Sequence, residues 1–482
     1  MQITLEQAEA SRLETDALVL IGFEGVPRPD FVPHLYEAGE ITGKSLEMTL
    51  LHQTPGFAAT RILLVGAGKP DGFNSHELRK LAGAAVRHLK AKSVRRVALS
   101  LDQAHAAPEF VSAAVEGAIL GNFDPDYLKS DKSDSKRIES FTISVEGDAA
   151  GLQAAVDRGR TMAEAQNFAR DLANAPPNLL GPSALAERAR HMAFEEGLEC
   201  EILDRDRMKQ LGMGALLAVA MGSAEAPATI VLRYKPAREP LDCVHLGLVG
   251  KGVTFDTGGI SIKPAEGMEK MKYDMAGGAA AIGAMRAIAQ LKPRIAVTAL
   301  IPAVENMPGS RAQRPGDIVT TLSGKTVEVM NTDAEGRMIL ADALTYAKTI
   351  GCTHLVDAAT LTGAIVVALG TINAGVFANN EELQQRWLNA SKAEGEKMWA
   401  MPMDEEYKEQ LKNVYADLQN IGTRQGGAIT AAMFLKEFAD PTPWVHLDIA
   451  GIAWLDEAKP YMAKGPTGAP VRSFVHLAMN WD

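Results

Sequence analysis

An alternation of short apolar segments with helix-periodic segments constrains this chain most strongly. Beyond Pro176-Pro177, the apolar segments lie near 200–204, 229–234, 244–250, 295–302, 327–331, 353–358, 374–379 and 445–449. The helix-periodic segments lie at 183–196, 276–291, 337–350 and 381–397. Strands that alternate with helices form α/β sheets whose faces the helices cover. The sequence therefore predicts an α/β domain with a mixed, mainly parallel central sheet flanked by helices.

The N-terminal third shows the same alternation on a smaller scale. Strands are predicted at 16–22, 60–66, 95–101 and 138–145, helices at 75–92 and 108–120, and a polar loop at 124–136. A long helix predicted over 151–173 ends near Pro176-Pro177, because proline stops a helix. The 482 residues suffice for two domains. We expect a smaller N-terminal α/β domain over 1–165, connected by this helix to a C-terminal domain over 166–482.

Composition narrows the classes of protein that fit. A net charge of −11 opposes indiscriminate binding to nucleic acid or anionic membranes. The longest uncharged stretch, 358–380, is interrupted by Thr, Asn and Gly, which indicates buried strands and turns rather than a membrane span. No basic region leads into an apolar core at the N-terminus, so no signal peptide is expected. Three scattered cysteines fit a reducing compartment, and we expect a cytoplasmic protein.

The heptad Asn331-Thr-Asp-Ala-Glu-Gly-Arg337 is the first candidate for chemistry. It follows an apolar run at 326–330 that is typical of a strand leading into a turn. Asp333 and Glu335 are two residues apart, so in extended backbone both carboxylates would point to the same side. Such a pair beside an arginine is either a solvated surface cluster or part of a cation site.

A second charged cluster lies upstream and favours the cation site. Lys251, Asp256, Lys263 and Asp274 follow an apolar run and are separated by glycines. Glycines around charges at the end of a strand are typical of a binding site, because they allow close backbone approach. The P-loop pattern fails, since the positions that require Gly and Ser or Thr hold His245 and Gly252. Four carboxylates in one buried pocket require cations, because unpaired buried charge is very costly.

Other catalytic chemistries find little support in the sequence. Gly-x-Ser-x-Gly does not occur, and the ten histidines include no His-Glu-x-x-His. Cys243/His245 and Cys352/His354 lie within apolar runs, where buried side chains are the expected outcome. Ligands rich in oxygen fit Mn, Mg or Zn, with harder ligands favouring Mn and Mg. The residues alone leave the identity of the metal open.

Taken together, these segments resemble the leucyl aminopeptidase family of cytosolic dinuclear metallo-aminopeptidases. The resemblance is carried by Lys251-Gly-Val-Thr-Phe-Asp-Thr-Gly-Gly259, Ile262-Lys-Pro264, Asp274-Met-Ala-Gly-Gly278, Glu305-Asn-Met-Pro-Gly309, Arg314-Pro-Gly-Asp317, Ser323-Gly-Lys-Thr326, the heptad 331–337, Ala341-Asp-Ala-Leu344, Asp357-Ala-Ala-Thr-Leu-Thr-Gly363 and His446-Leu-Asp-Ile-Ala-Gly451. In order and spacing it extends over residues 165–475, whereas the N-terminal part resembles macro-like folds only loosely. Departures at Ser310, Arg311, Met338 and 469–472 touch no presumed ligand.

The resemblance implies a metal-ligand set of Lys251, Asp256, Asp274, Asp333 and Glu335. Asp256 and Glu335 would bridge two divalent ions, and Asp333 would add its backbone carbonyl. Lys251 would bind as a neutral amine, which requires a pKa several units below the ordinary value of about 10.4, lowered by the metal charge. A lysine among this many acids is otherwise an ion-pair partner.

Catalytic and substrate-binding roles follow from the same resemblance. The metals would lower the pKa of a bridging water, and Lys263 would stabilise the oxyanion as its charge develops. Arg337 would hold bicarbonate as general base for the water, unless it only balances the charge of Asp333 and Glu335. The implied substrate contacts are Met271, Asn331, Thr360, Leu361, Gly363 and Ala450.

As a whole, the resemblance predicts an aminopeptidase that releases N-terminal residues, preferentially leucine and similar ones, from peptides. It also implies a homohexamer arranged as a dimer of trimers. Two alternatives stay open at this point. One is an additional DNA-binding role of the N-terminal domain, which the acidic net charge disfavours. The other is phosphoester hydrolysis by the same metal pair, for which no phosphate loop is evident.

Overall fold

The computed structural model describes residues 1–26, 32–131, 136–237 and 244–481. The chain divides into two compact units, one of Met1–Asn167 with Leu455–Gly465 and the other of Phe168–Trp454 with Pro466–Asp482. Both units are α/β, as predicted. Cys243 lies outside the described residues. No helix in the described ranges is long and apolar enough to cross a membrane.

The N-terminal unit is built on a six-stranded sheet. Its order is β1 (Gln2–Gln7), β6 (Ser140–Val145), β5 (Arg96–Leu101), β2 (Ala17–Gly22), β4 (Arg61–Gly66) and β3 (Met48–His52). Neighbouring strands are parallel except for the antiparallel pair β3–β4. Helices α2 (Ser75–Ala91) and α3 (Pro108–Asn122) pack on one face, and α1 (Pro33–Glu37) lies with loops on the other. The inner strands are buried on both faces, which explains their continuous apolar runs.

The predicted linking helix is α4 (Gln153–Asn174), and the boundary between the two units falls within it. The strands β1 and β3 were not predicted. Both lie at the edges of the sheet, where most of their residues are exposed or half-buried, so their sequences lack an apolar run. The predicted loop over 124–136 contains no helix or strand in its described part.

The second unit contains a nine-stranded sheet. Its order is β16 (Met398–Ala400), β15 (Ala374–Ala378), β18 (Trp444–Asp448), β14 (His354–Ala359), β9 (His245–Gly250), β11 (Ala296–Asn306), β8 (Ala228–Tyr234) and β7 (Glu199–Leu203), and β10 (Gly252–Asp256) pairs with β11. The central strands β18, β14, β9 and β11 are mutually parallel, and so are β10 and β11. Strands β15, β8 and β7 pair antiparallel with their inner neighbours. The carboxyl ends of the parallel strands therefore lie at one edge.

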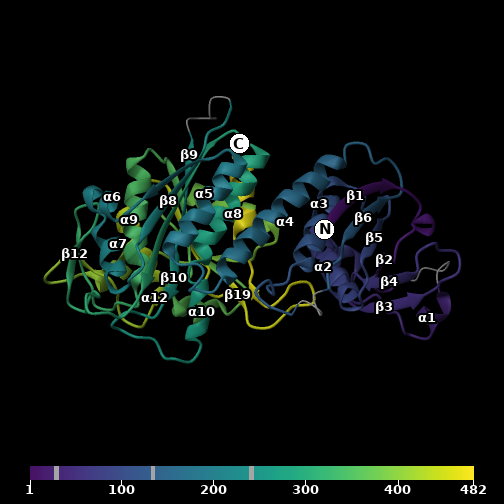
Figure 1. Ribbon diagram of the computed structural model, residues 1–482, viewed down its shortest axis with the longest axis horizontal. Coiled ribbons are helices and arrows are strands. Elements are labelled where there is room, and N and C mark those ends of the chain that lie inside the picture. The colour runs from purple at the N-terminus through teal and green to yellow at the C-terminus, as the bar shows by residue number, and fades with distance from the viewer. Residues whose placement is uncertain (27–31, 132–135, 238–243, 482) are drawn as a thin grey trace. The chain divides into compact units, whose positions relative to one another are not determined.

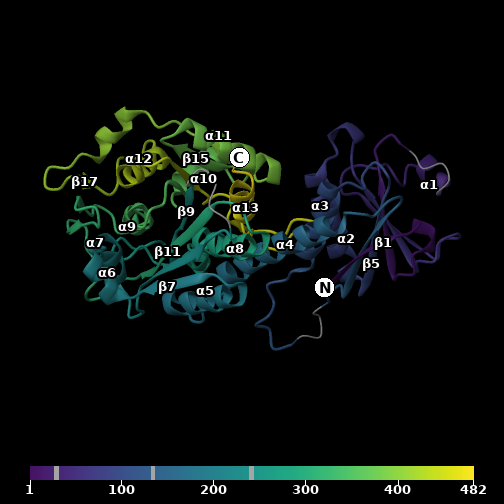
Figure 2. The ribbon, with the colours of Figure 1, turned by 90° about the horizontal axis from the view of Figure 1, so that it is seen from above.

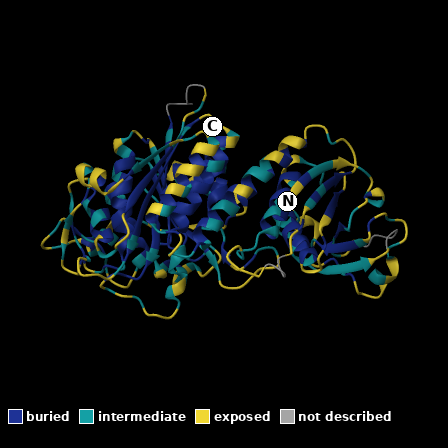
Figure 3. Cartoon of the chain, in the orientation of Figure 1, coloured by how far each residue is buried: buried dark blue, intermediate teal, exposed yellow. Residues whose placement is uncertain are grey.

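Helices cover both faces of this sheet, as Figures 1 and 2 show. One face carries α5 (Pro182–Glu196), α8 (Ala276–Leu291), α11 (Glu381–Glu394) and α13 (Val471–Met479). The other carries α7 (Gly214–Val219), α9 (Glu335–Thr349) and α12 (Gly427–Ala439). Buried residues fill the sheet and the helix faces that meet it (Figure 3). The predicted mixed, mainly parallel sheet flanked by helices is confirmed.

Shorter elements complete this unit. They are α6 (Arg205–Leu211), α10 (Gly363–Leu369) and the three-stranded sheet of β12 (Ile318–Thr320), β13 (Thr326–Glu328) and β17 (Leu418–Gln419). A two-stranded pair, β19 (Trp454–Leu455) and β20 (Gly465–Pro466), lies at the boundary of the two units. The strand predicted over 327–331 ends at Glu328, and the helix predicted over 337–350 begins earlier, at Glu335. Both differences concern the acidic heptad.

Candidate metal centre

The charged residues predicted from the sequence meet at the carboxyl edge of the large sheet. Lys251 follows β9, Asp256 ends β10, and Thr360 follows β14. Because these strands run parallel, the side chains that follow them lie at the same edge. This is the edge at which α/β sheets bind ligands.

Asp274 and Glu335 reach the same place from the starts of two helices. Asp274 lies two residues before α8, and Glu335 is the first residue of α9. A Cβ on Gly277 would lie only 1.9 Å from the carbonyl oxygen of Ala358, so glycine is required for α8 to approach the end of β14. The two helices therefore bring acids to the strand ends from opposite faces of the sheet.

The extended backbone expected for the Asp333–Glu335 pair is wrong. Asp333 lies in a turn, where its N–H donates to Asn331 Oδ1 at 2.8 Å. Asparagine favours such turns because its side chain accepts from the backbone two residues on. Glu335 lies at a helix N-terminus, which favours a negative charge. The two carboxylates converge because a turn and a helix start follow each other.

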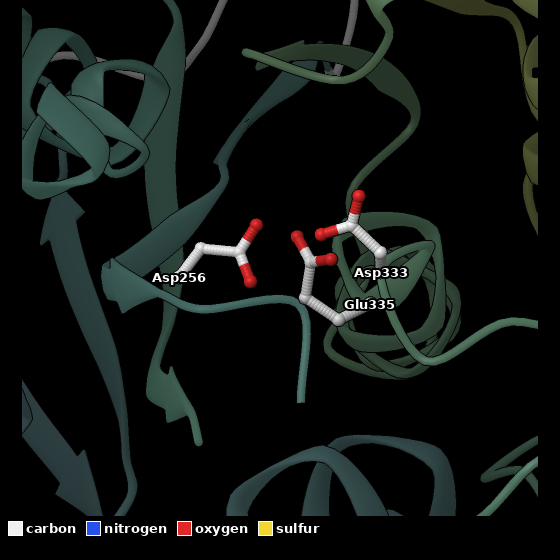
Figure 4. Close-up of side chains that lie close together, drawn as sticks. All are labelled: Asp256, Asp333 and Glu335. Carbon is white, nitrogen blue, oxygen red and sulfur yellow. The ribbon is translucent and has the colours of Figure 1, made fainter. Parts of the chain in front are cut away.

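Asp256, Asp333 and Glu335 form the acidic centre of the site. Each offers one carboxylate oxygen, and these oxygens all lie within 4.8 Å of one another. Figure 4 shows the Asp256 carboxylate facing those of Asp333 and Glu335. Asp256 and Glu335 are buried and Asp333 is half-buried. Asp256 Oδ1 also accepts from Gly258 N at 2.9 Å and from Asn306 Nδ2 at 2.8 Å, so its position is fixed.

Lys251 lies inside this cluster. Its Nζ is 2.8 Å from Asp274 Oδ1 and 2.8 Å from Glu335 Oε1, and donates to the carbonyl oxygen of Thr360 at 2.9 Å. The residue is only 3% exposed. A Cβ on Gly336 would lie 2.8 Å from Lys251 Cε, so the side chain passes over α9 only because that position is glycine.

Lys263 contacts the other side of the acids. Its Nζ lies 2.8 Å from Asp256 Oδ2 and forms an ion pair with Asp333 Oδ1. The side chain is 22% exposed, so the ammonium group lies at the border between the cluster and solvent. Both lysines and all four predicted acids therefore occupy one site.

The acids outnumber their cationic partners. Four carboxylates face two ammonium groups, so two negative charges would be unbalanced if all four acids were ionised. Burial, reinforced by Asp256, raises the pKa of Glu335 to about 8. Burial likewise raises the pKa of Asp274 to about 6, although Lys251 opposes the shift. Glu335 Oε2 is buried without a hydrogen-bond partner among the described residues. Excess negative charge and an orphaned carboxylate oxygen both fit divalent cations.

The protein's own charges keep Lys251 protonated. Burial disfavours its ammonium form, but the charges of Asp274, Glu335 and Asp256 outweigh burial and raise its pKa. With the protein's own charges alone, Lys251 is an ion-pair partner. Lysine becomes a neutral ligand only where metal ions replace its positive charge.

Arg337 is a buried cation beside the acids. Its Nη1 donates to the carbonyl oxygen of Asn420 at 2.8 Å, and its Nε has no hydrogen-bond partner among the described residues. Burial lowers the pKa of Arg337 to about 10, although Glu335 and Asp448 oppose the shift. Within the described part of the chain, Arg337 forms no ion pair within 4 Å. Its free Nε can donate to an anion.

The residues predicted to contact substrate differ in their hydrogen-bond partners and in their exposure. Thr360 donates through Oγ1 to Asp274 Oδ1 at 2.7 Å, and Asp274 N donates to Met271 O at 3.4 Å. Leu361 N and Ala450 N donate to Asp448 Oδ1 at 3.2 and 3.3 Å. Asn331 shapes the turn that carries Asp333, whereas Gly363 begins α10 and is exposed.

Several polar residues of the site were missed from the sequence. These are Asn306 and Asp448, which end strands, Thr332 beside Asp333, and Asn420 after β17. Asn306 and Asp448 lie within the family motifs, so their strand-end position was a usable signal. Asn420 follows a two-residue strand in a polar segment, and nothing in the sequence distinguished it.

Among the described residues, Cys352 does not form a nucleophilic site with a histidine. Cys352 is buried, and burial raises the pKa of its thiol to about 12. Its Sγ lies 3.8 Å from Nε2 of His245, which itself lies 2.7 Å from Thr298 Oγ1. A thiol with a raised pKa is a poor nucleophile.

Known proteins resemble the chain over both units. Residues 167–475 match the cytosol aminopeptidase family, catalytic domain, and residues 32–132 match the N-terminal domain of that family. Probable cytosol aminopeptidases of Solibacter usitatus and Koribacter versatilis are 64% and 50% identical, each over 100% of both chains. A bottromycin maturation enzyme in complex with Mn is 34% identical with a TM-score of 0.87, covering 97% of this chain and 99% of that one.

A mutant of tomato leucine aminopeptidase is 35% identical with a TM-score of 0.89, covering 99% of this chain and 96% of that one. These similarities confirm the resemblance and the enzyme class predicted from the motifs. They give no support to DNA binding or to phosphoester hydrolysis. The chain belongs to the cytosol aminopeptidase family, and it is a metal-dependent hydrolase that removes N-terminal residues from peptides.

Proposed function

We propose that Lys251, Asp256, Asp274, Asp333 and Glu335 would hold two divalent cations. The observation that carries this proposal is the group of three carboxylate oxygens within 4.8 Å of one another, beside an orphaned oxygen of Glu335. Like charges this close and this deeply buried require positive charge among them. The two lysines supply only part of it.

The residues around the cations have separate tasks. When bound, a divalent pair acts as Lewis acid and lowers the pKa of water, which makes a nucleophile available near neutral pH. Lys263 keeps its proton, because Asp256 and other acids outweigh burial and raise its pKa. Its side chain is 22% exposed beside the acidic centre, where its ammonium group can stabilise the developing charge on a scissile carbonyl oxygen.

Manganese is the proposed metal, with zinc and magnesium as the other candidates. The oxygen-rich ligands favour it, and the bottromycin maturation enzyme was solved in complex with Mn. Arg337 is proposed to hold bicarbonate through its free Nε. Arg337→Ala should lower kcat about tenfold, less than the roughly 10²- to 10⁴-fold loss of a complete acid–base group, because water and bulk bicarbonate can partly substitute. Equal kcat in both proteins would leave Arg337 without that role.

Substrate and assembly are proposed from the similar proteins. Leucine and similar residues are the proposed N-terminal preference, with contacts from Met271, Asn331, Thr360, Leu361, Gly363 and Ala450. A homohexamer, a dimer of trimers, is proposed from the family resemblance alone, and a cytoplasmic location is proposed from the name of the relatives. We assign 1–165 to the N-terminal domain and 166–482 to the catalytic domain. Light scattering and a panel of aminoacyl anilides test the hexamer and the preference.

The central experiment compares metal-stripped with metal-restored protein. Leucine anilide hydrolysis should vanish on removal of metal and return when about two Mn²⁺ per chain are bound, measured by elemental analysis. A phosphodiester chromogen serves as the competing substrate and should stay intact. Hydrolysis of the phosphodiester but not of the anilide, or full anilide activity without metal, would overturn the proposal.

A further inference from the structure

Asn420 joins the two ends of the acidic heptad, although it lies far away in the sequence. It directly follows β17, which pairs with β13, and its N–H donates to the carbonyl oxygen of Glu328 at 3.0 Å. Asn420 is fully buried. Strand β13 ends at Glu328, so Asn420 lies beside the chain where it leaves the small sheet.

Beyond the end of β13, the side chain of Asn420 takes the place of a neighbouring strand as hydrogen-bond partner of the backbone. Its Oδ1 accepts from Met330 N at 2.8 Å and from Asn331 N at 3.3 Å. Its Nδ2 donates to the carbonyl oxygen of Asn331 at 2.7 Å. Three backbone groups before Asp333 are thereby satisfied by one primary amide. A backbone turn that departs from a sheet at this point would otherwise leave these polar groups without a protein partner.

The backbone of Asn420 contacts the other side of the heptad. Its carbonyl oxygen accepts from Arg337 Nη1 at 2.8 Å. One residue therefore holds the segment 330–331, which leads into Asp333, and also holds Arg337. Glu335 lies between these two anchored points, on the first turn of α9. The distance between the acids and the guanidinium group is set from outside the heptad.

We propose that Asn420 is a positioning residue for this site: its amide fixes the turn that carries Asp333, and its carbonyl fixes Arg337. Asn420 itself is not a ligand in this proposal and does not contact substrate. The inference rests on the proposed roles of Asp333 and Arg337. Residues that orient metal ligands from behind commonly change metal affinity or activity about 10- to 100-fold when replaced.

Two variants separate this role from simple packing. Asn420→Ala removes all three side-chain hydrogen bonds. Asn420→Asp keeps the volume and the accepting oxygen, but loses the Nδ2 donor to Asn331 O. The matched control is Asn413→Ala in the same segment: Asn413 donates to Glu328 Oε2 and accepts from Tyr415 N at 2.7 Å. Its side chain makes four hydrogen bonds, one more than the side chain of Asn420, but none of them reaches residues 330–337.

The dissociation constant for Mn²⁺ is measured on stripped protein by calorimetry, and kcat and KM are measured with leucine anilide. For both Asn420 variants we expect the Mn²⁺ dissociation constant to rise about tenfold and kcat to fall about 10- to 100-fold. KM should change less than about threefold, because the side chain of Asn420 binds Asn331 only through its backbone and does not itself contact substrate. Asn413→Ala should stay within about twofold of the parent in all three values.

An outcome in which the Asn420 variants match Asn413→Ala in kcat and in Mn²⁺ binding would overturn the proposal, even with a lower Tm. If Asn420→Ala does not fold, the values for Asn420→Asp test the proposal instead. A parent protein that binds no Mn²⁺ or hydrolyses no anilide contradicts the proposed function instead. The two failures are therefore distinguishable.

Discussion

Two buried acids on the same helix, Glu335 and Asp342, show how a binding carboxylate differs from a structural one. They lie seven residues apart on α9, about two turns, and therefore on the same face. Both are almost fully buried. Burial raises the pKa of both, to about 8 for Glu335 and about 7 for Asp342. Neither burial nor pKa separates the two.

Their hydrogen bonds do separate them. Asp342 Oδ2 accepts from Leu216 N at 2.9 Å, and its Oδ1 accepts from Leu322 N at 2.8 Å. Both oxygens of Asp342 are thus used by backbone groups, which fixes α7 and the 321–325 turn against α9. Glu335 uses Oε1 toward Lys251, whereas its Oε2 has no hydrogen-bond partner among the described residues. A buried acid with an unused oxygen marks a place for a ligand.

The largest effect on kcat is expected when Glu335, the acid with the unused oxygen, is replaced. Glu335→Ala should lower kcat with leucine anilide by more than about 10³-fold, because two-metal chemistry loses a ligand. Asp333→Ala should behave alike. Circular dichroism and Tm of the metal-free variants should stay near the parent values. The exposed Glu382→Ala is the matched control. Full activity of either cluster variant would end the assignment.

A smaller kinetic effect is expected at Lys263. Lys263→Ala should lower kcat about 10²- to 10³-fold, the range found for loss of one oxyanion-stabilising group. Bound Mn²⁺ per chain, measured by elemental analysis, should stay unchanged. Loss of metal in proportion to activity would instead make Lys263 a structural counter-ion for Asp256 and Asp333.

Asp342→Ala tests the structural side of the comparison. Its removal leaves two buried N–H groups without an acceptor, each costing about 1–3 kcal/mol. Urea unfolding should show a destabilisation of about 2–6 kcal/mol, whereas kcat per folded chain should stay within about twofold. A kcat loss as large as that of Glu335→Ala, at parental stability, would contradict the distinction between the two acids.

The smallest effect is expected in the pH dependence of metal stabilisation. The pKa of Glu335 is raised from 4.5 to about 8, so the folded state keeps a proton that the unfolded state has already lost. Stability of the stripped protein should therefore fall as pH rises from about 4.5 to about 8. Mn²⁺ replaces that proton, so the Tm increase on adding Mn²⁺ should grow with pH. Asp342 contributes equally to the stability of the metal-free and the Mn²⁺-bound protein. Its contribution therefore cancels in the Tm increase. A Tm increase that is independent of pH would argue against metal at Glu335.

The sequence predicted the strands that are buried on both faces, since β2 and β9 have continuous apolar runs. It missed β1 and β3, whose edge positions leave them half-exposed. Strand β10 was missed as well, because its glycine-rich start resembles a loop. A continuous apolar run in the sequence indicates a strand that is buried on both faces. Edge strands are less buried, so they lack such a run.

The site, like the fold, could be predicted only in part from the sequence. Each acid and lysine could be named from charge, glycine spacing and family motifs. Their convergence, however, depends on contacts such as Lys251 over Gly336 and Asn306 against Asp256. Asn420 could not be found from the sequence, because a single asparagine after a two-residue strand carries no local signal.

The sequence by itself determined the chemistry of this protein, namely an excess of carboxylates around two lysines and the class of enzyme that uses them. Tertiary structure alone decided which oxygens meet, which of them is left without a partner, and which distant residue holds the heptad in place. The physical reason is that charge and residue type belong to the chain. Distance and burial arise only when parallel strand ends and helix starts pack together.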